Sequence, residues 1–158
     1  MGRAMRRVLA FAIVILAAVA MMVPTAEAVA PAAVSGGGHG TVNGATPFSQ
    51  FGFEVARHAD GSVTGNFNCL MAGASEFPGF DLMAVRGQVT DAVFAGDTVT
   101  FEGSGMFQTG NLGKSPATFR AVVTEGGPGI GTLQLTLLTP FEFVLPTEYV
   151  LHRRIDVR

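Results

Sequence analysis

Cysteine is almost absent from this chain, in which Cys69 is the only one among 158 residues. A single thiol excludes an internal disulfide, so the folded part has to be held together by its hydrophobic core. Cys69 shares a predicted strand face with Phe67, and no histidine lies near it in the sequence. We therefore expect a buried and inert thiol, with intermolecular pairing or a nucleophilic role as the alternatives.

Basic residues are scarce, and beyond the N-terminal region only Arg153 and Arg154 stand together. Without residues 1–28, Lys and Arg number 7 against 11 Asp and Glu, which gives a net charge of −4. Affinity for nucleic acids rests mostly on Lys and Arg that neutralise phosphates. We therefore expect no nucleic-acid partner.

Catalytic and metal-binding motifs are missing as well. The segment Gly113-Lys-Ser115 has Gln108 at the position where a phosphate-binding loop needs glycine. The segment Gly73-Ala-Ser-Glu-Phe77 ends in Phe where a nucleophile elbow needs a small residue. Zinc ligands usually include two at short spacing, and none of the three histidines has such a neighbour: His39, His58 and His152. We predict no catalytic residue, no metal site and no cofactor.

Carboxylates leave one enzymatic alternative open. Glu54, Asp97 and Glu102 lie on or beside predicted strands, and an acid–base pair assembled from several strands, with a histidine, is the chemistry they would support. The alternation of the strands places them on the solvent face. Solvated charges are therefore the preferred interpretation.

Long apolar runs are confined to the N-terminus. Residues 8–23 form an unbroken apolar run after a basic segment at 1–7, and Ala26 and Ala28 supply the small residues that a signal peptidase recognises. This pattern predicts a cleavable helical signal peptide at 1–28. The alternative is an uncleaved anchor, although the 16 apolar residues fall short of the ~20 that span a bilayer. We expect an extracytoplasmic protein, secreted or associated with the cell envelope (the periplasm included), without stable membrane insertion after cleavage.

The remainder of the chain shows the alternation of β-strands. Residues 29–37 resemble a flexible linker, and residues 38–158 form one domain in which apolar side chains recur at every second position. No connection is long and amphipathic enough for a crossover helix, which excludes a parallel sheet. The pattern predicts an all-β fold, a single antiparallel β-sandwich or flattened β-barrel of about eight strands.

Glycines lie inside several of these strands, at Gly65, Gly87, Gly103 and Gly105. Glycine weakens a strand, so its use there indicates bends or bulges in a strongly curved sheet.

The longest irregular stretch, residues 71–81, carries Phe77 and Phe80 around Pro78-Gly79. Apolar side chains exposed in a loop often mark contact with a ligand or partner, so these two are our candidate binding residues. The alternative is a loop that folds back over one end of the core.

Six segments occur in an order that carries a family resemblance: residues 36–38, 51–55, 64–68, 96–105, 122–129 and the alternating run 133–137. In this order the chain resembles bacterial secreted proteins of unknown function akin to the post-COAP-1 domain, over about residues 36–157. Glu125-Gly-Gly stands where that family commonly has an aspartate-rich turn, and residues 71–81 have no counterpart. The resemblance implies an exported β domain and transfers no catalytic residue.

Three hypotheses on function follow. The first is an exported, non-enzymatic β domain that binds, or associates structurally with, an envelope or extracellular partner. The second is a carrier of a small apolar ligand in a cavity inside a closed β-barrel. The third is a hydrolase or isomerase with a site assembled from several strands.

Overall fold

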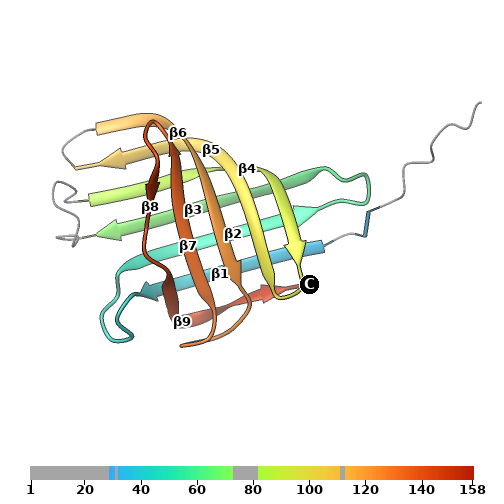
Figure 1. Cartoon of the computed structure of the whole chain (residues 1–158), viewed down its shortest axis with the longest axis horizontal. Helices are drawn as coiled ribbons and strands as arrows, with labels where there is room; N and C mark the ends of the chain where they lie inside the picture. Colours follow the sequence, from blue (N-terminus) through green and yellow to red (C-terminus); the bar gives the residue numbers. More distant parts are fainter. Residues whose placement is uncertain (1–28, 31, 73–81, 111–112) are drawn as a thin grey trace, which may run out of the picture.

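A computed structural model of the chain describes residues 29–30, 32–72, 82–110 and 113–158, and these form nine β-strands (Figure 1). The strands are β1 (Ala32–Thr41), β2 (Ser49–Arg57), β3 (Val63–Ala72), β4 (Leu82–Ala95), β5 (Thr98–Thr109), β6 (Gly113–Thr124), β7 (Thr132–Thr139), β8 (Phe143–Val144) and β9 (Glu148–Val157). Within these residues there is no helix long and apolar enough to span a bilayer.

The strands form one antiparallel sheet that closes into a ring. Each strand from β1 to β7 pairs with the next, and β9 pairs with both β7 and β1. Because β6 occupies one edge of β7, the short β8 and the start of β9 share its other edge. The prediction of an all-β antiparallel fold of about eight strands is confirmed.

The ring is not a regular barrel. In Figure 1, β1, β2 and β3 form one layer, which β7 and the adjoining parts of β5 and β6 cross steeply as a second layer. The long strands β4 and β5 bend from one layer to the other. A register shift between Val89 and Asp91 interrupts the β4–β5 ladder, and such bulges increase local bending.

The core lies inside the ring, where the alternating apolar side chains meet. Four phenylalanines fill its centre, with ring centroids 5.0 to 6.4 Å apart: Phe53, Phe67, Phe101 and Phe119. Leu133, Leu135 and Leu137 of β7 are each 1% exposed. Cys69 is free and buried in the same core, as expected. Because Cys69 forms no disulfide, the fold is stabilised by the burial of these apolar side chains.

Glycines inside the strands allow close approach of the backbones. Gly87 of β4 lies opposite Gly105 of β5. A Cβ added at Gly105 would lie 2.0 Å from the carbonyl oxygen of Arg86, and one at Gly103 would lie 2.6 Å from the ring of Phe119. Side chains at these positions would force apart β4 and β5 or displace Phe119.

The expected linker differs from the structure after its first residues. We predicted a flexible segment at 29–37, whereas β1 begins at Ala32 and pairs with β2 and β9. Glycines hide the alternation because they have no side chain, yet a Cβ on Gly36 would lie 2.6 Å from the ring of Phe53. The glycines of β1 are therefore part of the packing.

Candidate functional site

The carboxylates of the enzymatic alternative lie apart on the outside of the ring. Glu54 and Asp97 are exposed. Glu102 forms an ion pair with Arg120 at 2.6 Å. The side chains remain 41% exposed for Glu102 and 48% exposed for Arg120. The structure does not bring these three carboxylates together, and their exposure agrees with the preferred interpretation as solvated charges rather than with the acid–base alternative.

The histidines divide into one isolated residue and one pair. The Nε2 atom of exposed His58 lies 2.8 Å from the Thr64 hydroxyl. His39 and His152 have no neighbour in sequence, but they face each other across β1 and β9. In the described part of the chain, no group of three or more His, Cys, Asp or Glu could hold a metal ion.

Residues 1–28, with the predicted recognition residues Ala26 and Ala28, lie outside the described residues. The candidate binding residues Phe77 and Phe80 lie outside them as well.

A set of buried polar side chains was not foreseen from the sequence. Among the residues that the structure describes, four polar or charged ones are buried: Thr41, Ser49, Thr109 and Glu148. They belong to one end of the ring, where β1, β3 and β5 end and where β2, β4 and β6 begin (Figure 1). We call this the polar end.

Glu148 is the one residue of this set with an ionisable side chain, and it is 1% exposed. The hydroxyl of Ser49, itself 3% exposed, donates a hydrogen bond to its Oε2 atom. Gly40 of β1 provides the space, because a Cβ there would lie 2.0 Å from the same oxygen. The pair therefore depends on contributions from three neighbouring strands, β1, β2 and β9.

Burial controls the ionisation of this end. It raises the pKa of the Glu148 carboxyl from 4.5 to about 7, and the Ser49 hydrogen bond offsets part of that effect. Burial also raises the pKa of the Cys69 thiol, with a smaller contribution from the charge of Glu148. The carboxyl can therefore exchange a proton near neutral pH, whereas the thiol stays protonated and is a poor nucleophile.

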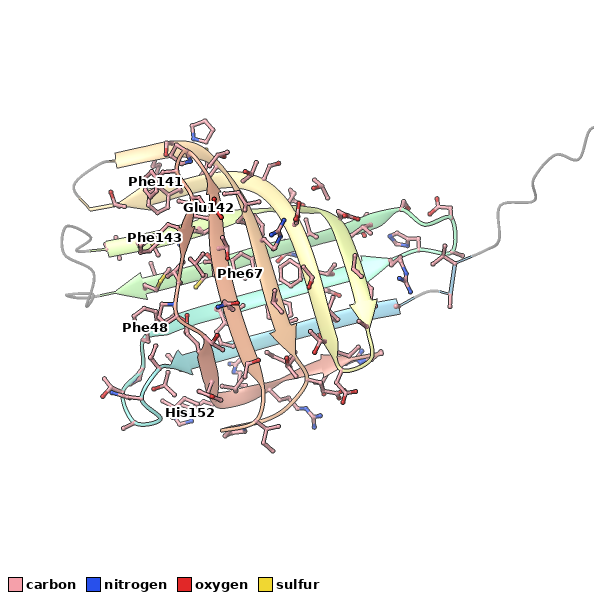
Figure 2. The ribbon with its side chains drawn as sticks, viewed as in Figure 1. Phe48, Phe67, Phe141, Glu142, Phe143 and His152 are labelled. Carbon is pink, nitrogen blue, oxygen red and sulfur yellow. The ribbon has the colours of Figure 1, made fainter. Side chains whose placement is uncertain are left out.

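Phenylalanines gather at the same end of the ring. Figure 2 shows Phe48, Phe141 and Phe143 at this end, with Phe48 just before β2 and Phe143 in the short strand β8. Phe48 and Phe143 are half-buried against the core. Phe141 is 39% exposed and meets Phe107 edge to face, with centroids 5.8 Å apart. The polar end thus combines a partly exposed aromatic rim with a buried carboxyl–hydroxyl pair.

The alternation of side chains along the strands indicates that Ser49 and Glu148 both face inward. Ser49 lies two positions before Phe51, and Glu148 lies two positions before Val150, so each falls on an inward face. The sequence alone does not show that β2 and β9 flank β1, and this arrangement is what brings the two side chains together.

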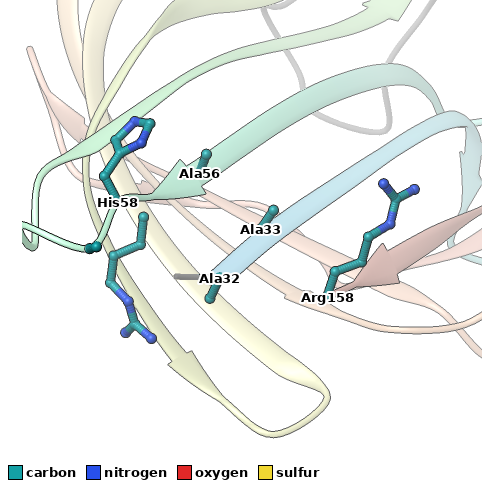
Figure 3. A pocket seen from close by; sticks show the side chains of 7 residues that line it. Ala32, Ala33, Ala56, His58 and Arg158 are labelled. Atoms are coloured by element: carbon teal, nitrogen blue, oxygen red, sulfur yellow. The ribbon is translucent and has the colours of Figure 1, made fainter. Parts of the chain in front are cut away.

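A surface groove lies at the end of the ring opposite the polar end (Figure 3). It is an open groove of about 440 Å³ whose lining includes Arg57, His58 and Arg158. Arg57 donates to the carbonyl oxygen of Ala30 at 3.1 Å and covers the ring of Phe94 at 4.9 Å. Because these contacts hold Arg57 in place and His58 lies across the groove from Arg158 (Figure 3), these side chains do not converge on one point.

The geometry of the polar end is what supports a function for this chain. No family model, no curated protein and no solved structure matches the chain.

Proposed function

We propose that the chain is an exported, non-enzymatic binding domain whose polar end takes a small, mainly apolar molecule with one hydrogen-bonding group. The observation that carries this proposal is the Ser49–Glu148 pair, which is buried beside the apolar core. A carboxyl placed there offers a ligand a hydrogen-bonding group in apolar surroundings, where such a bond is stronger than in water.

The packing of the interior limits where such a molecule fits. The four central phenylalanines occupy the middle of the ring, so a ligand belongs at the polar end rather than along the whole axis. The aromatic rim formed by Phe48, Phe141 and Phe143 supplies apolar contact there. Ligand sites commonly combine such apolar walls with a few convergent polar groups.

The arrangement favours binding over catalysis. The Ser49 hydroxyl donates a hydrogen bond to a carboxyl that is neutral about half of the time at pH 7. Ser49 therefore has no strong base beside it that could activate it as a nucleophile. Cys69 is fully buried with its thiol protonated. Proton transfer by Glu148 is the second candidate, because a pKa near 7 suits a general acid or base.

Export is part of the same proposal and is supported by the signal-like pattern of residues 1–28. The ligand would then be met outside the cytoplasm, free or at the cell envelope. An envelope or extracellular protein partner, our first expectation from the sequence, would act through the outer faces of the ring.

Binding is tested with a neutral apolar fluorophore that carries an amine, N-phenyl-1-naphthylamine, and by native mass spectrometry of protein purified from its source. We expect saturable fluorescence enhancement and a retained small molecule. Glu148→Met should weaken probe binding by about tenfold, the equivalent of one lost hydrogen bond. Glu102→Gln, which changes a carboxylate on the outer surface, is the matched control and should leave the affinity unchanged.

Two results would overturn the proposal. The first is the absence of both saturable binding and a retained molecule. The second is equal affinity in the wild type and the Glu148→Met variant. If the retained molecule is instead chemically converted on prolonged incubation, and Glu148→Gln stops the conversion, the proton-transfer function replaces the binding function.

A further inference from the structure

Two histidines form a cross-strand pair on the outer surface, away from the polar end's interior. His39 of β1 lies directly opposite His152 of β9, and their rings meet edge to face with centroids 6.0 Å apart and planes at 89°. His152 is exposed and His39 is half-buried. Figure 2 shows His152 at the lower margin of the molecule, on β9. Both imidazoles are therefore within reach of one solvent ion.

The backbone is irregular on both strands around this pair. The ladder shifts register between His39 and Gly40, which leaves Leu151 as the extra residue of a bulge. Next to His152, Arg153 has a φ of 71°, the only non-glycine residue with positive φ in the described chain. Opposite it, Gly38 has a φ of 137°, and a Cβ there would lie 2.0 Å from the carbonyl oxygen of His152.

These irregularities orient side chains rather than improve the sheet. Bulges re-aim side chains and occur frequently beside functional sites. A non-glycine residue at positive φ costs free energy, which the surrounding structure has to offset. The bulge at Leu151 and the positive φ of Arg153 flank His152 on its two sides. We take this combination as an indication that the orientation of the two imidazoles has a function.

We propose that His39 and His152 form a surface site for a divalent late transition-metal ion, with Cu²⁺ bound most tightly. A ring nitrogen binds such an ion at about 2.1 Å, which places the ion roughly 3 Å from each ring centroid. Two imidazoles that share one ion thus have centroids about 5 to 6 Å apart. The observed 6.0 Å lies at the upper end of this range, and side-chain rotation from the edge-to-face arrangement turns one nitrogen of each ring towards the ion.

The donor set determines which ions this site takes. Imidazole suits copper, nickel and zinc. Among the divalent ions of the first transition row, affinity is highest for Cu²⁺, with Ni²⁺ and Zn²⁺ below it. Calcium and magnesium require oxygen ligands, which this pair does not supply. Since the described residues contain no group of three or more potential ligands, water completes the coordination. The site is therefore open and exchangeable, and independent of the binding function proposed for the polar end.

The only tyrosine of the chain provides an internal probe. Tyr149 pairs with Thr41, two residues along β1 from His39, and the chain has no tryptophan. Two residues of a strand span about 7 Å. A Cu²⁺ ion bound by the pair therefore lies close enough to quench the fluorescence of Tyr149, whose side chain is exposed.

The experiment titrates Cu²⁺ into the purified chain and follows both tyrosine fluorescence and binding heat. We expect saturable quenching at one ion per chain, weaker binding of Ni²⁺ and Zn²⁺, and none of Mg²⁺ or Ca²⁺. His39→Ala and His152→Ala should each weaken Cu²⁺ binding by at least tenfold. His58→Ala, which removes the isolated histidine bonded to Thr64, should change nothing.

Thermal unfolding followed by circular dichroism establishes that each variant is folded, and both altered histidines lie on the outer face. The proposal is overturned if Cu²⁺ does not bind saturably, or if either His39→Ala or His152→Ala binds Cu²⁺ as tightly as the wild type does. It is also overturned if His58→Ala weakens binding as much as those two variants do.

Discussion

The buried carboxyl of Glu148 predicts that the stability of the fold falls as pH rises towards neutrality. Its pKa is 4.5 in an unfolded chain and about 7 in the folded one, so the folded state holds the proton more tightly. A group whose folded pKa is raised contributes full stability below its unfolded pKa. That contribution is lost progressively between pH 4.5 and 7 and stays absent above pH 7.

The magnitude follows from the difference between the two pKa values. Each pKa unit corresponds to about 1.4 kcal/mol, so the shift from 4.5 to about 7 makes the folded state about 3 kcal/mol less stable at pH 8 than at pH 4 through this residue alone. Marginally stable domains have only about 5–15 kcal/mol in total. The effect is therefore large enough to measure.

The assay compares the wild type with Glu148→Gln by urea unfolding at several pH values from 4 to 8. Glutamine keeps an oxygen that accepts the Ser49 hydrogen bond but does not titrate. We expect the difference in unfolding free energy between the two proteins to change by about 3 kcal/mol across this range, in favour of the variant at high pH.

Other titrating groups are common to both proteins and cancel in this difference. A constant difference between the wild type and Glu148→Gln would show that Glu148 is solvated, and would refute the reasoning.

Three further predictions concern the packing of the ring. Gly105→Ala should cost about 2 kcal/mol or more in a denaturation assay because its Cβ would lie 2.0 Å from a backbone oxygen, whereas Gly52→Ala, with nothing within 4 Å, should be nearly neutral. Cys69 should resist alkylation in the native protein and react fully in urea, and rapid native labelling would contradict its complete burial. Phe119→Ala should cost about 3–5 kcal/mol. The exposed ion-pair variant Arg120→Ala should cost at most about 1 kcal/mol, and equal losses for these two variants would refute the assignment of the core.

Strand alternation predicted most of the fold because it records which face of each strand is buried. The inward positions of Phe51, Phe53 and Val55 were correct, as was the antiparallel class. Alternation failed where side chains are missing, which is why the glycine-rich part of β1 resembled a linker. In that strand the neighbours supply the information, since the ring of Phe53 fills the space over Gly36.

The candidate site was less accessible to prediction than the fold. Strand alternation correctly placed Glu54, Asp97 and Glu102 on the outer face, which removes them as candidates but does not point to the buried pair. Glu148 is inward-facing by the same alternation, but its importance depends on the contact with Ser49, 99 positions away in sequence. The pair of His39 and His152 likewise exists only because β9 returns to close the ring against β1.

The buried Ser49–Glu148 pair is a poor choice for stability alone, and this allows stability and function to be separated. A buried polar pair replaced by apolar residues of similar size is often neutral or stabilising, whereas removal of one partner leaves the other unsatisfied. The double variant Ser49→Ala with Glu148→Met should therefore be at least as stable as the wild type at pH 8, and Ser49→Ala alone should be less stable. The double variant should nevertheless lose affinity for the apolar amine probe. A double variant that is folded and binds the probe as tightly as the wild type would show that the pair serves neither stability nor ligand recognition.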